Sequence, residues 1–338
     1  MMSEPNMNQI SDHTPSFFER PGVKRQVIPI GNGVPMGIER VSNPVLGIGG
    51  AYGAWGDSYD NVTLPEFIAQ RLGHELPAEE RLNLSELGFD RRHHIGDLSN
   101  EEHVEAEIEV ASRFLSEAAQ ACGWTPQEVE AVLVGVSGPA ANDFLVQAAS
   151  RAGIPEQALK VSVHKACDGS VGALNLALNP GLGMVNQIGR NLAEELNGKK
   201  VLVGGIEGLS RFIRQARDKN ALQLFGSAAG VIGLIPGKTM RFLVGKAFEA
   251  FDDEGVLAVR MYYPHSRRFS AGESRVEVTL AGEQHIRVAG MMHEPEGEMP
   301  IEMAGPMGMV KLFVRNVDTI LAMISIPEIA LPSPKGAA

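Results

Sequence analysis

Cysteine is scarce in this chain, and long apolar runs are missing from it. Its 338 residues include 2 cysteines, Cys122 and Cys167, which are too few for a disulfide framework. The longest candidate for a membrane-spanning helix, residues 320–331, is short and is interrupted by Pro327. The first residues have neither the basic region nor the apolar core of a signal peptide. These absences predict a cytoplasmic protein without a membrane span.

Basic charge is not in excess either. The chain carries 30 Lys and Arg against 41 Asp and Glu, which gives a net charge of −11. Nucleic-acid binding needs a basic face to contact phosphates, so we expect no general nucleic-acid binding. In contrast, 44% of the residues are hydrophobic. A chain of this length and composition can bury a large core, as two domains or as one double-sized unit.

Predicted helices and apolar strands alternate after a polar start. Residues 1–25 contain several prolines and are expected to form a loose tail, with order beginning near Val27. The predicted helices cover residues 101–122, 143–151, 168–178 and 209–219, and the predicted strands cover 131–136, 161–163, 200–204 and 224–234. This alternation indicates an α/β domain with a mainly parallel sheet that helices cover.

A glycine-rich segment, residues 45–56, invites comparison with dinucleotide-binding loops. The spacing does not fit, because after Gly47 and Gly49 the third glycine of a G-x-G-x-x-G pattern would fall at Tyr52. The apolar run before these glycines is also too short for a full strand. We therefore predict that the glycines form turns.

The most informative segment runs from Val161 to Leu174 and places Cys167 between a strand and a helix start. Small residues after Cys167 allow a sharp turn that would hold the sulfur over the free N–H groups of the first helical turn. Those groups and the helix dipole favour the thiolate, which is the nucleophilic form. Asp168 suits a helix start but opposes thiolate formation if it faces the sulfur. The alternative is a buried cysteine that acts as a small apolar residue.

Four segments in order resemble the β-ketoacyl-acyl-carrier-protein synthase III enzymes of the thiolase fold. Residues 86–95 are similar to the family's Thr-Gly-Ile-x-x-Arg segment, and residues 166–169 to its Ala-Cys-Ser/Ala-Gly nucleophile turn. Residues 225–230 resemble its Phe-Gly-Asp-Gly-Ala-Gly. Residues 301–305 and 311–315 resemble its Met-x-Gly-x-x-x-Phe-Lys-x-x-Val stretch. The resemblance implies a thiolase-like, layered α-β-α-β-α fold in which Cys167 is the nucleophile.

The resemblance also implies a reaction. Cys167 would take an acyl group from an acyl-coenzyme A as a thioester, and the acyl group would then be joined to a malonyl thioester that loses carbon dioxide. The implied ligands are coenzyme A thioesters and phosphopantetheine-linked substrates, with no tightly bound cofactor. The implied partners are acyl carrier protein and a second thiolase-fold chain, in a homodimer or heterodimer. The backbone N–H of Cys167 would be one donor to the thioester oxygen, and the family's glycine-rich segment near the end of the protein normally contributes another.

The chain departs from this family after its fourth segment. The family carries a histidine and an asparagine beyond that segment, whereas this sequence has no histidine after His293, and Asn316 lies on the predicted helix itself. The catalytic histidine and asparagine of the family therefore have no counterpart here. We predict a complete first thiolase-like half over residues 26–238 and a partial second half over residues 239–338.

Two other functions stay open at this point. Acyl transfer to a hydroxyl or an amine needs Cys167 but needs neither decarboxylation nor the missing histidine and asparagine. Alternatively, the chain is a non-catalytic subunit or a fragment that a related chain completes.

Several arginines are candidates for binding coenzyme A phosphates or an acidic carrier protein. Arg92 belongs to the first resembling segment, and three others recur at a spacing of three residues on one predicted helix: Arg211, Arg214 and Arg217. Guanidinium groups suit phosphate and carboxylate ligands, and such a cluster is notable in an otherwise acidic chain. The alternative is a solvated helix face.

Two phenylalanines are candidates for the acyl pocket. Phe225 begins the third resembling segment, and Phe144 follows the stretch that corresponds to the family's loop at the dimer interface. That stretch is about three residues shorter here than in the family, and the acyl-chain length stays open.

The remaining cysteine and histidines are expected to be structural. Cys122 ends an amphipathic helix, and the histidines at 93–94 and 103 have no metal-binding constellation around them, so we predict no metal site. His164 precedes Cys167 by three residues, but strand alternation places it with Ser162 rather than beside the sulfur.

Overall fold

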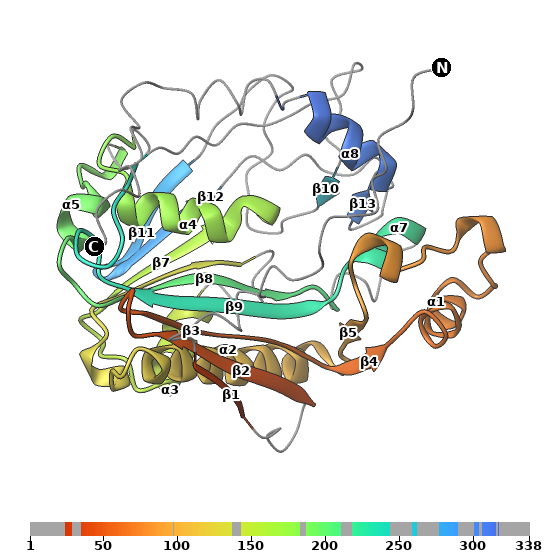
Figure 1. The fold of residues 1–338 in the computed structure, drawn as a ribbon, viewed down its shortest axis with the longest axis horizontal. Coiled ribbons are helices and arrows are strands. Elements are labelled where there is room, and N and C mark those ends of the chain that lie inside the picture. The colour runs from red at the N-terminus through yellow and green to blue at the C-terminus, as the bar shows by residue number, and fades with distance from the viewer. Residues whose placement is uncertain are drawn as a thin grey trace, which may run out of the picture.

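A computed structural model of the chain describes residues 24–28, 35–96, 98–136, 143–182, 187–210, 218–243, 259–261, 277–289, 301–303, 306–315 and 317. These residues form a large mixed sheet with helices on both of its faces (Figure 1). The α/β class predicted from the sequence is therefore confirmed. Within the described ranges, every helix is too short or too polar to cross a bilayer.

The large sheet has nine strands in the order β1-β2-β3-β9-β8-β6-β7-β12-β11. These strands are β1 (Lys24–Ile28), β2 (Met36–Asn43), β3 (Ile48–Trp55), β6 (Ala131–Gly135), β7 (Leu159–His164), β8 (Val201–Gly208), β9 (Ser227–Leu234), β11 (Glu277–Gly282) and β12 (His285–Ala289). Two smaller sheets pair β4 (Asp57–Tyr59) with β5 (Arg92–His94), and β10 (Val259–Met261) with β13 (Ile301–Met303).

The described helices lie on and beside the large sheet. They are α1 (Leu64–Leu72), α2 (Asn100–Ala121), α3 (Phe144–Arg151), α4 (Gly169–Leu178), α5 (Leu192–Leu196), α7 (Lys219–Leu224) and α8 (Pro306–Arg315). Helices α2 and α3 cover one face and α4 covers the other, with a separate apolar core beneath each layer (Figure 1).

The prediction of a mainly parallel sheet is wrong, because only the block β8-β6-β7-β12 is parallel and the other five pairings of the large sheet are antiparallel. β6 pairs in parallel with β7 and β8, and β12 pairs in parallel with β7. Every residue of β6 and of β7 is buried. Strands covered on both faces need a continuous apolar run, which explains why the sequence shows one at residues 131–136.

Three of the predicted helices are present where their signals lie, and residues 211–217 of the fourth lie outside the described residues. α2 begins with a capping box between Ser99 and Glu102 and is followed by Gly123 in the left-handed conformation, at φ 72°. The predicted strand over 224–234 starts later, at Ser227. The reason is that Asp218 caps α7, accepting a 2.7 Å hydrogen bond from the N–H of Ala221, and the helix then continues to Leu224.

The prediction of turns for residues 45–56 is wrong, because most of this segment forms β3. Gly47 and Gly56, next to its two ends, have positive φ values of 64° and 94° and fit the turn prediction. The glycines inside the strand have a different role. A Cβ built on Gly53 would lie 1.8 Å from the carbonyl oxygen of Gly37 on β2. The inner glycines are therefore needed for close approach to neighbouring backbone.

The predicted boundary after residue 238 stays a prediction. β11 and β12 come from beyond that boundary, yet they extend the same sheet as the strands before it. The other described elements beyond residue 238 are the small β10–β13 sheet and α8. The described residues therefore form three layers, α, β and α, of the five that the sequence predicted.

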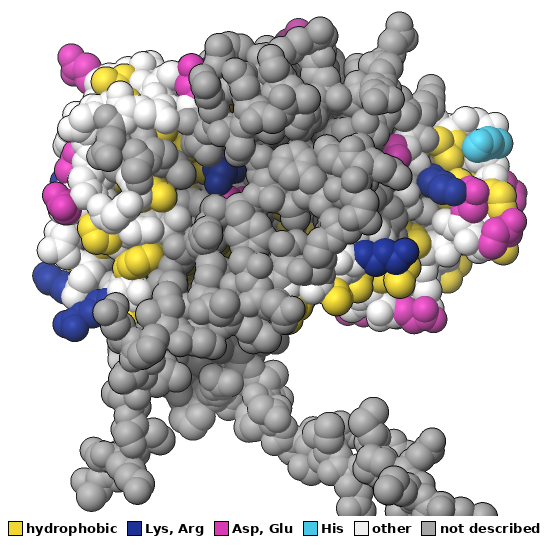
Figure 2. Space-filling model, turned by 90° about the horizontal axis from the view of Figure 1, so that it is seen from above, with side chains coloured by type: hydrophobic (Ala, Val, Ile, Leu, Met, Phe, Trp, Pro, Cys, Tyr) yellow, Lys and Arg dark blue, Asp and Glu magenta, His cyan; other side chains and the backbone are white. Residues whose placement is uncertain are grey.

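A buried aromatic cluster joins α1 to the rest of the molecule. His94 is 1% exposed and stacks on Phe67 of α1, with 4.8 Å between ring centroids and 12° between ring planes. Tyr59 lies beside both rings. Figure 2 shows charged side chains of both signs on the surface at this end of the molecule. Burial, reinforced by the charge of Arg71, lowers the pKa of His94 from 6.5 to about 3.

We predict that Gly53→Ala destabilises the protein strongly. A methyl group at this position collides with a carbonyl oxygen of the neighbouring strand, and overpacking of this kind costs about 3 kcal/mol. Gly230→Ala is the matched control, because a Cβ on Gly230 of β9 meets no atom within 4 Å. The control should change the free energy of unfolding by less than about 1 kcal/mol in urea denaturation. Equal losses in the two variants would contradict the close approach of β2 and β3.

We also predict that His94 makes the fold sensitive to acid. Because its pKa is about 3 in the folded chain and 6.5 as an ordinary histidine, the unfolded chain binds a proton more readily. The contribution of neutral His94 to the free energy of unfolding is complete above the ordinary histidine pKa. It is lost as the pH falls from that value toward the pKa of His94 in the folded chain. The loss between neutral pH and about pH 5 should be about 2 kcal/mol.

Urea denaturation at the two pH values measures this loss. His94→Leu should remove most of the pH dependence, and His74→Gln, at an exposed position, should leave it in place. An unchanged pH dependence in His94→Leu would contradict the assignment.

Candidate active site

Cys167 lies between β7 and α4, as the sequence predicts. β7 ends at His164, a 3-10 helix over Ala166–Asp168 makes the turn, and α4 begins at Gly169. Parallel strands flank β7 on both sides, so the turn lies at the carboxyl edge of the parallel strands, where α/β proteins commonly bind ligands. The Cys167 residue is exposed.

The first turn of α4 rests directly on the backbone of the sheet. A Cβ built on Gly135 of β6 would lie 2.4 Å from the carbonyl carbon of Gly169. A Cβ on Gly205 of β8 would lie 3.2 Å from the Cβ of Ser170. Because these strand positions carry no side chain, the start of the helix approaches the sheet closely. This contact fixes the position of the turn that holds Cys167.

The rest of α4 is held by a small-residue stripe. Gly169, Gly172, Ala173, Leu176 and Ala177 are buried at helical spacing and face the apolar core over β6, β7 and β8. Val171, on the other side of the same helix, is 64% exposed. The sheet beneath α4 therefore supports the Cys167 turn, and the apolar side chain of Val171 faces outward from the same helix.

The pKa of the Cys167 thiol is raised above its ordinary value. Burial of the sulfur is the largest cause, although the residue as a whole is exposed. The carboxylate of Glu207 is the second cause and that of Asp168 also contributes, whereas the backbone N–H of Cys167 acts in the opposite direction. The lowering of the thiol pKa that is expected from the helix start is therefore smaller than the raising caused by burial and the two carboxylates. The predicted opposition from Asp168 is present, although Lys165 forms an ion pair with Asp168.

Arg92 and the third resembling segment lie side by side. Arg92 is half-buried on β5, with its guanidinium carbon 3.7 Å from the ring centroid of Phe89, and burial lowers its pKa. A Cβ built on Gly226 would lie 3.5 Å from the Cδ of Arg92. The start of β9 is therefore packed against β5, which brings residues 86–95 and 225–230 together.

The other two segments reach the same region. Glu207 of β8 pairs in register with Ala228 of β9, and its charge acts on Cys167. β13, which holds residues 301–303 of the fourth segment, lies against α7, whose last residue directly precedes Phe225. The first and third segments thus meet at β5 and the start of β9, and residues 301–303 of the fourth lie against the helix that leads into the third.

The two phenylalanines lie in different cores. Phe144 is 3% exposed and packs in the core beneath α2 and α3, on the face of the sheet opposite α4. Phe225 directly follows α7 and is partly buried against the small core of α1 and α7. The structure does not bring the two rings together, and their role in an acyl pocket stays a prediction.

Several predicted residues lie outside the described residues. These are Arg211, Arg214, Arg217, His293, Asn316 and the segment at 304–305. Their proposed roles stay predictions.

The described histidines of β7 and β12 belong to the face of the sheet opposite α4. Ser162 and His164 alternate with Val161 and Val163, which pack beneath α4, so their side chains point away from that helix. Ser162 and His285 of β12 are hydrogen-bonded, with 3.0 Å between Oγ and Nε2. We find no support here for His164 as a base, in agreement with the sequence prediction.

Cys122 is a structural cysteine, as the sequence predicts. A Cβ on Gly233 of β9 would lie 2.3 Å from its sulfur, so the thiol fills the space above that glycine. Burial raises the pKa of Cys122 to about 11. The thiol is therefore protonated at neutral pH and is poorly nucleophilic.

Glu207 is the functional candidate that the sequence prediction missed. The predicted strand ended at residue 204, whereas β8 continues to Gly208. Extending the alternation from Val203 through Gly205 would have placed Glu207 on the face that α4 covers. The mixed small and polar residues after 204 concealed this signal.

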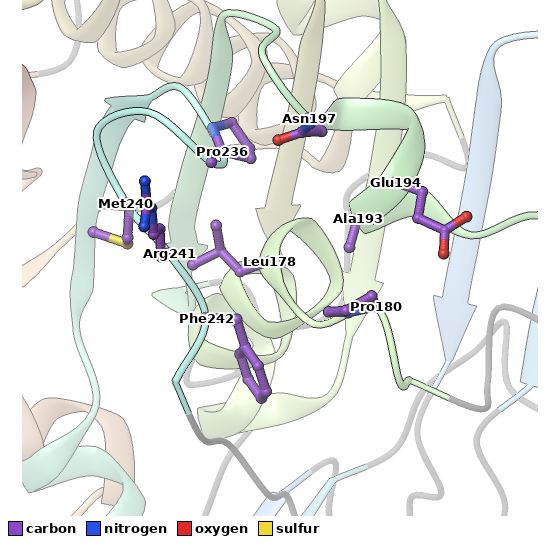
Figure 3. A pocket seen from close by; sticks show the side chains of 10 residues that line it. Leu178, Pro180, Ala193, Glu194, Asn197, Pro236, Met240, Arg241 and Phe242 are labelled. Carbon is purple, nitrogen blue, oxygen red and sulfur yellow. The ribbon is translucent and has the colours of Figure 1, made fainter. Parts of the chain in front are cut away.

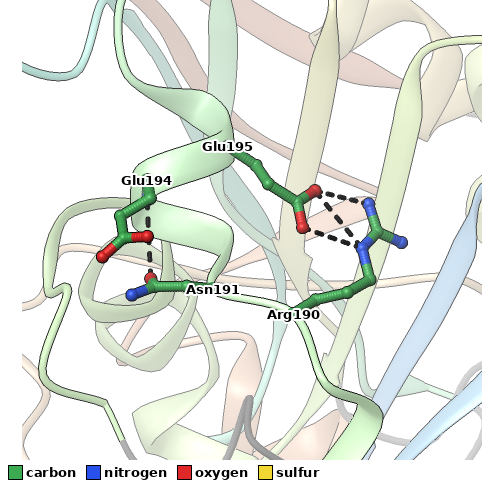
Figure 4. Close-up of polar contacts among 4 residues, drawn as sticks. All are labelled: Arg190, Asn191, Glu194 and Glu195. Carbon is green, nitrogen blue, oxygen red and sulfur yellow. Dashed lines mark hydrogen bonds and ion pairs between the residues drawn. The ribbon is translucent and has the colours of Figure 1, made fainter.

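A cavity of about 460 Å³ lies at the other end of α4. Leu178 of α4, Ala193 and Glu194 of α5, and residues 240–242 contribute to its lining (Figure 3). The side chain of Asn191 caps α5 by accepting a 3.4 Å hydrogen bond from the N–H of Glu194, and Arg190 pairs with Glu195 at 2.6 Å (Figure 4). These contacts order the segment that forms one wall of the cavity.

Comparison with known proteins gives structural likenesses only. No protein-family model matches the chain, and no curated protein matches it. Among solved structures, the chain is similar to a fungal type III polyketide synthase, with a TM-score of 0.47 and 16% identity over 83% of this chain and 72% of that one.

Two further likenesses are of the same order. A 3-oxoacyl-(acyl-carrier-protein) synthase III gives a TM-score of 0.45 and 16% identity over 82% of this chain and 73% of that one. A tetronic acid condensing enzyme gives a TM-score of 0.42 and 20% identity over 82% and 74%. Identities this low do not establish the chemistry of this chain, which has to be argued from its own residues.

We predict that Asp168→Asn makes the Cys167 thiol more acidic. The substitution removes a carboxylate that raises the thiol pKa and leaves the cation of Lys165 unpaired beside the turn. The rate of alkylation by iodoacetamide at neutral pH should therefore increase severalfold. Asp90→Asn, at an exposed position, is the control and should react as the wild type does. A rate that falls in Asp168→Asn would contradict the electrostatics of the turn.

Proposed function

We propose that this chain is an acyltransferase of the condensing type, in which Cys167 takes an acyl group from an acyl-coenzyme A and holds it as a thioester. The observation that best supports this proposal is the position of Cys167, which is exposed at the carboxyl edge of the parallel strands and is fixed by the first turn of α4. A thiol placed there can meet a ligand, and covalent catalysis needs such a nucleophile. Cys122, packed above Gly233, cannot serve.

The second half of the reaction has two candidates. In condensation, the acyl group would be joined to a malonyl thioester that loses carbon dioxide, as at the start of fatty-acid or polyketide synthesis. In simple transfer, a hydroxyl or an amine would receive it. The sequence has no histidine after His293, and His285 is engaged with Ser162 on the opposite face of the sheet. This observation favours keeping acyl transfer without decarboxylation as the second candidate.

The ligands and partners follow from this proposal. Coenzyme A thioesters and phosphopantetheine-linked substrates would bind without a tightly held cofactor. Arg92 is a candidate for contacting them, because it is half-buried beside the segment at 225–230 and its guanidinium rests on Phe89. Acyl carrier protein and a second thiolase-fold chain are the proposed protein partners. A chain that stays inactive until a related chain is added would be the non-catalytic subunit.

The test is the intact mass of the purified protein after incubation with a short panel of acyl-coenzyme A thioesters. The wild type should gain the mass of one acyl group. Cys122→Ser, the matched control at the second cysteine, should gain it as well. Cys167→Ser should gain none. An equal gain in Cys167→Ser, or no gain with any donor in folded wild type, would contradict the proposal.

The fate of the acyl group separates the two candidates. Carbon dioxide released from a malonyl thioester by the acylated protein indicates condensation. Loss of the acyl group to an added amine or alcohol, without such release, indicates simple transfer.

A further inference from the structure

Glu207 is a half-buried acid at the carboxyl end of β8, on the face of the sheet that α4 covers. Side chains alternate between the faces of a strand. Val203 packs in the core beneath α4, and Gly205 meets Ser170 at the start of that helix. Glu207 is the next residue on this face toward the carboxyl edge. It therefore projects beyond the first turn of α4, where the Cys167 turn lies.

The charge of Glu207 reaches the sulfur. Among the charged groups that act on the Cys167 thiol, Glu207 has the largest influence, larger than that of the adjacent Asp168. Asp168 is also neutralised in part by its ion pair with Lys165. A thiol in these surroundings is protonated at neutral pH, so it needs a proton acceptor as it attacks.

We propose that Glu207 is the general base of this site, a role that rests on the proposed acylation of Cys167. As the sulfur attacks the carbonyl carbon of the acyl donor, the Sγ–H bond breaks and the proton passes to the carboxylate of Glu207. The tetrahedral intermediate then expels the coenzyme A thiolate, which takes the proton back from Glu207. The products are the Cys167 thioester and free coenzyme A thiol, and no other reactant is needed.

The described histidines of β7 and β12 are poorly placed for this role. His285 is hydrogen-bonded to Ser162, and His164 shares the face of Ser162. Both belong to the side of the sheet opposite α4. The carboxylate is on the correct side.

The test is Glu207→Gln, compared with the wild type in two reactions of the same sulfur. Removing the carboxylate should make the thiol more acidic, so alkylation by iodoacetamide at neutral pH should become faster. Acylation by acetyl-coenzyme A, or by the donor that labels the wild type best, should become slower by about 100-fold, because general bases contribute rate factors of this order. Only a base gives these opposite changes.

Two control variants sharpen the comparison. Glu79→Gln, at an exposed position far from β8 in sequence, should leave both rates unchanged. Glu207→Asp should recover part of the acylation rate. Acylation that becomes faster together with alkylation in Glu207→Gln would overturn the proposal, as would an unchanged acylation rate. Wild type that takes no acyl group contradicts the proposed function instead, so the two failures are distinguishable.

A measurement on the wild type alone decides the matter if Glu207→Gln does not fold. The pKa of the thiol is first obtained from the pH dependence of alkylation. With a general base, the acylation rate should level off well below that pKa, since the protonated thiol is the reacting form. A rate that rises with the thiolate fraction up to the thiol pKa would overturn the proposal.

Discussion

The contact between the first turn of α4 and the bare backbone of the sheet determines where the chemistry of this protein lies. Gly135, Gly169 and Gly205 leave no room for side chains between helix and strands. Any larger residue would push the helix start outward and move Cys167 with it. The parallel strands therefore set the position of the turn, and a fixed position lets a nucleophile meet its ligand in one geometry.

The same arrangement gives the thiol an unusual setting. A helix start favours the thiolate, but burial and the carboxylates of Glu207 and Asp168 favour the thiol, and the second group of effects is larger. Such a cysteine resists adventitious alkylation and oxidation at neutral pH, because both need the thiolate. Acylation then depends on removing the proton at the moment of attack, which connects the electrostatics of the turn to the role proposed for Glu207.

Much of this architecture could be predicted from the sequence. The continuous apolar run at 131–136 indicated a covered parallel strand, and the small residues after Cys167 indicated the strand-to-helix turn. The sequence predicts turns at the glycines of 45–56, but most of them lie in a strand. A glycine that is needed because a neighbouring carbonyl, such as that of Gly37, leaves no space for a side chain cannot be distinguished in sequence from one that is needed for a positive φ. The influence of Glu207 could not be predicted, since it depends on the register between β8 and α4.

Locating the acyl group within the chain tests the account most directly. The protein is incubated with an acyl-coenzyme A, digested, and the modified peptide is identified by mass spectrometry before and after treatment with neutral hydroxylamine, which cleaves thioesters but spares amides. We expect the label on the peptide that contains Cys167, with complete loss in hydroxylamine. A label on Cys122, or a stable label on lysine side chains alone, would contradict the account.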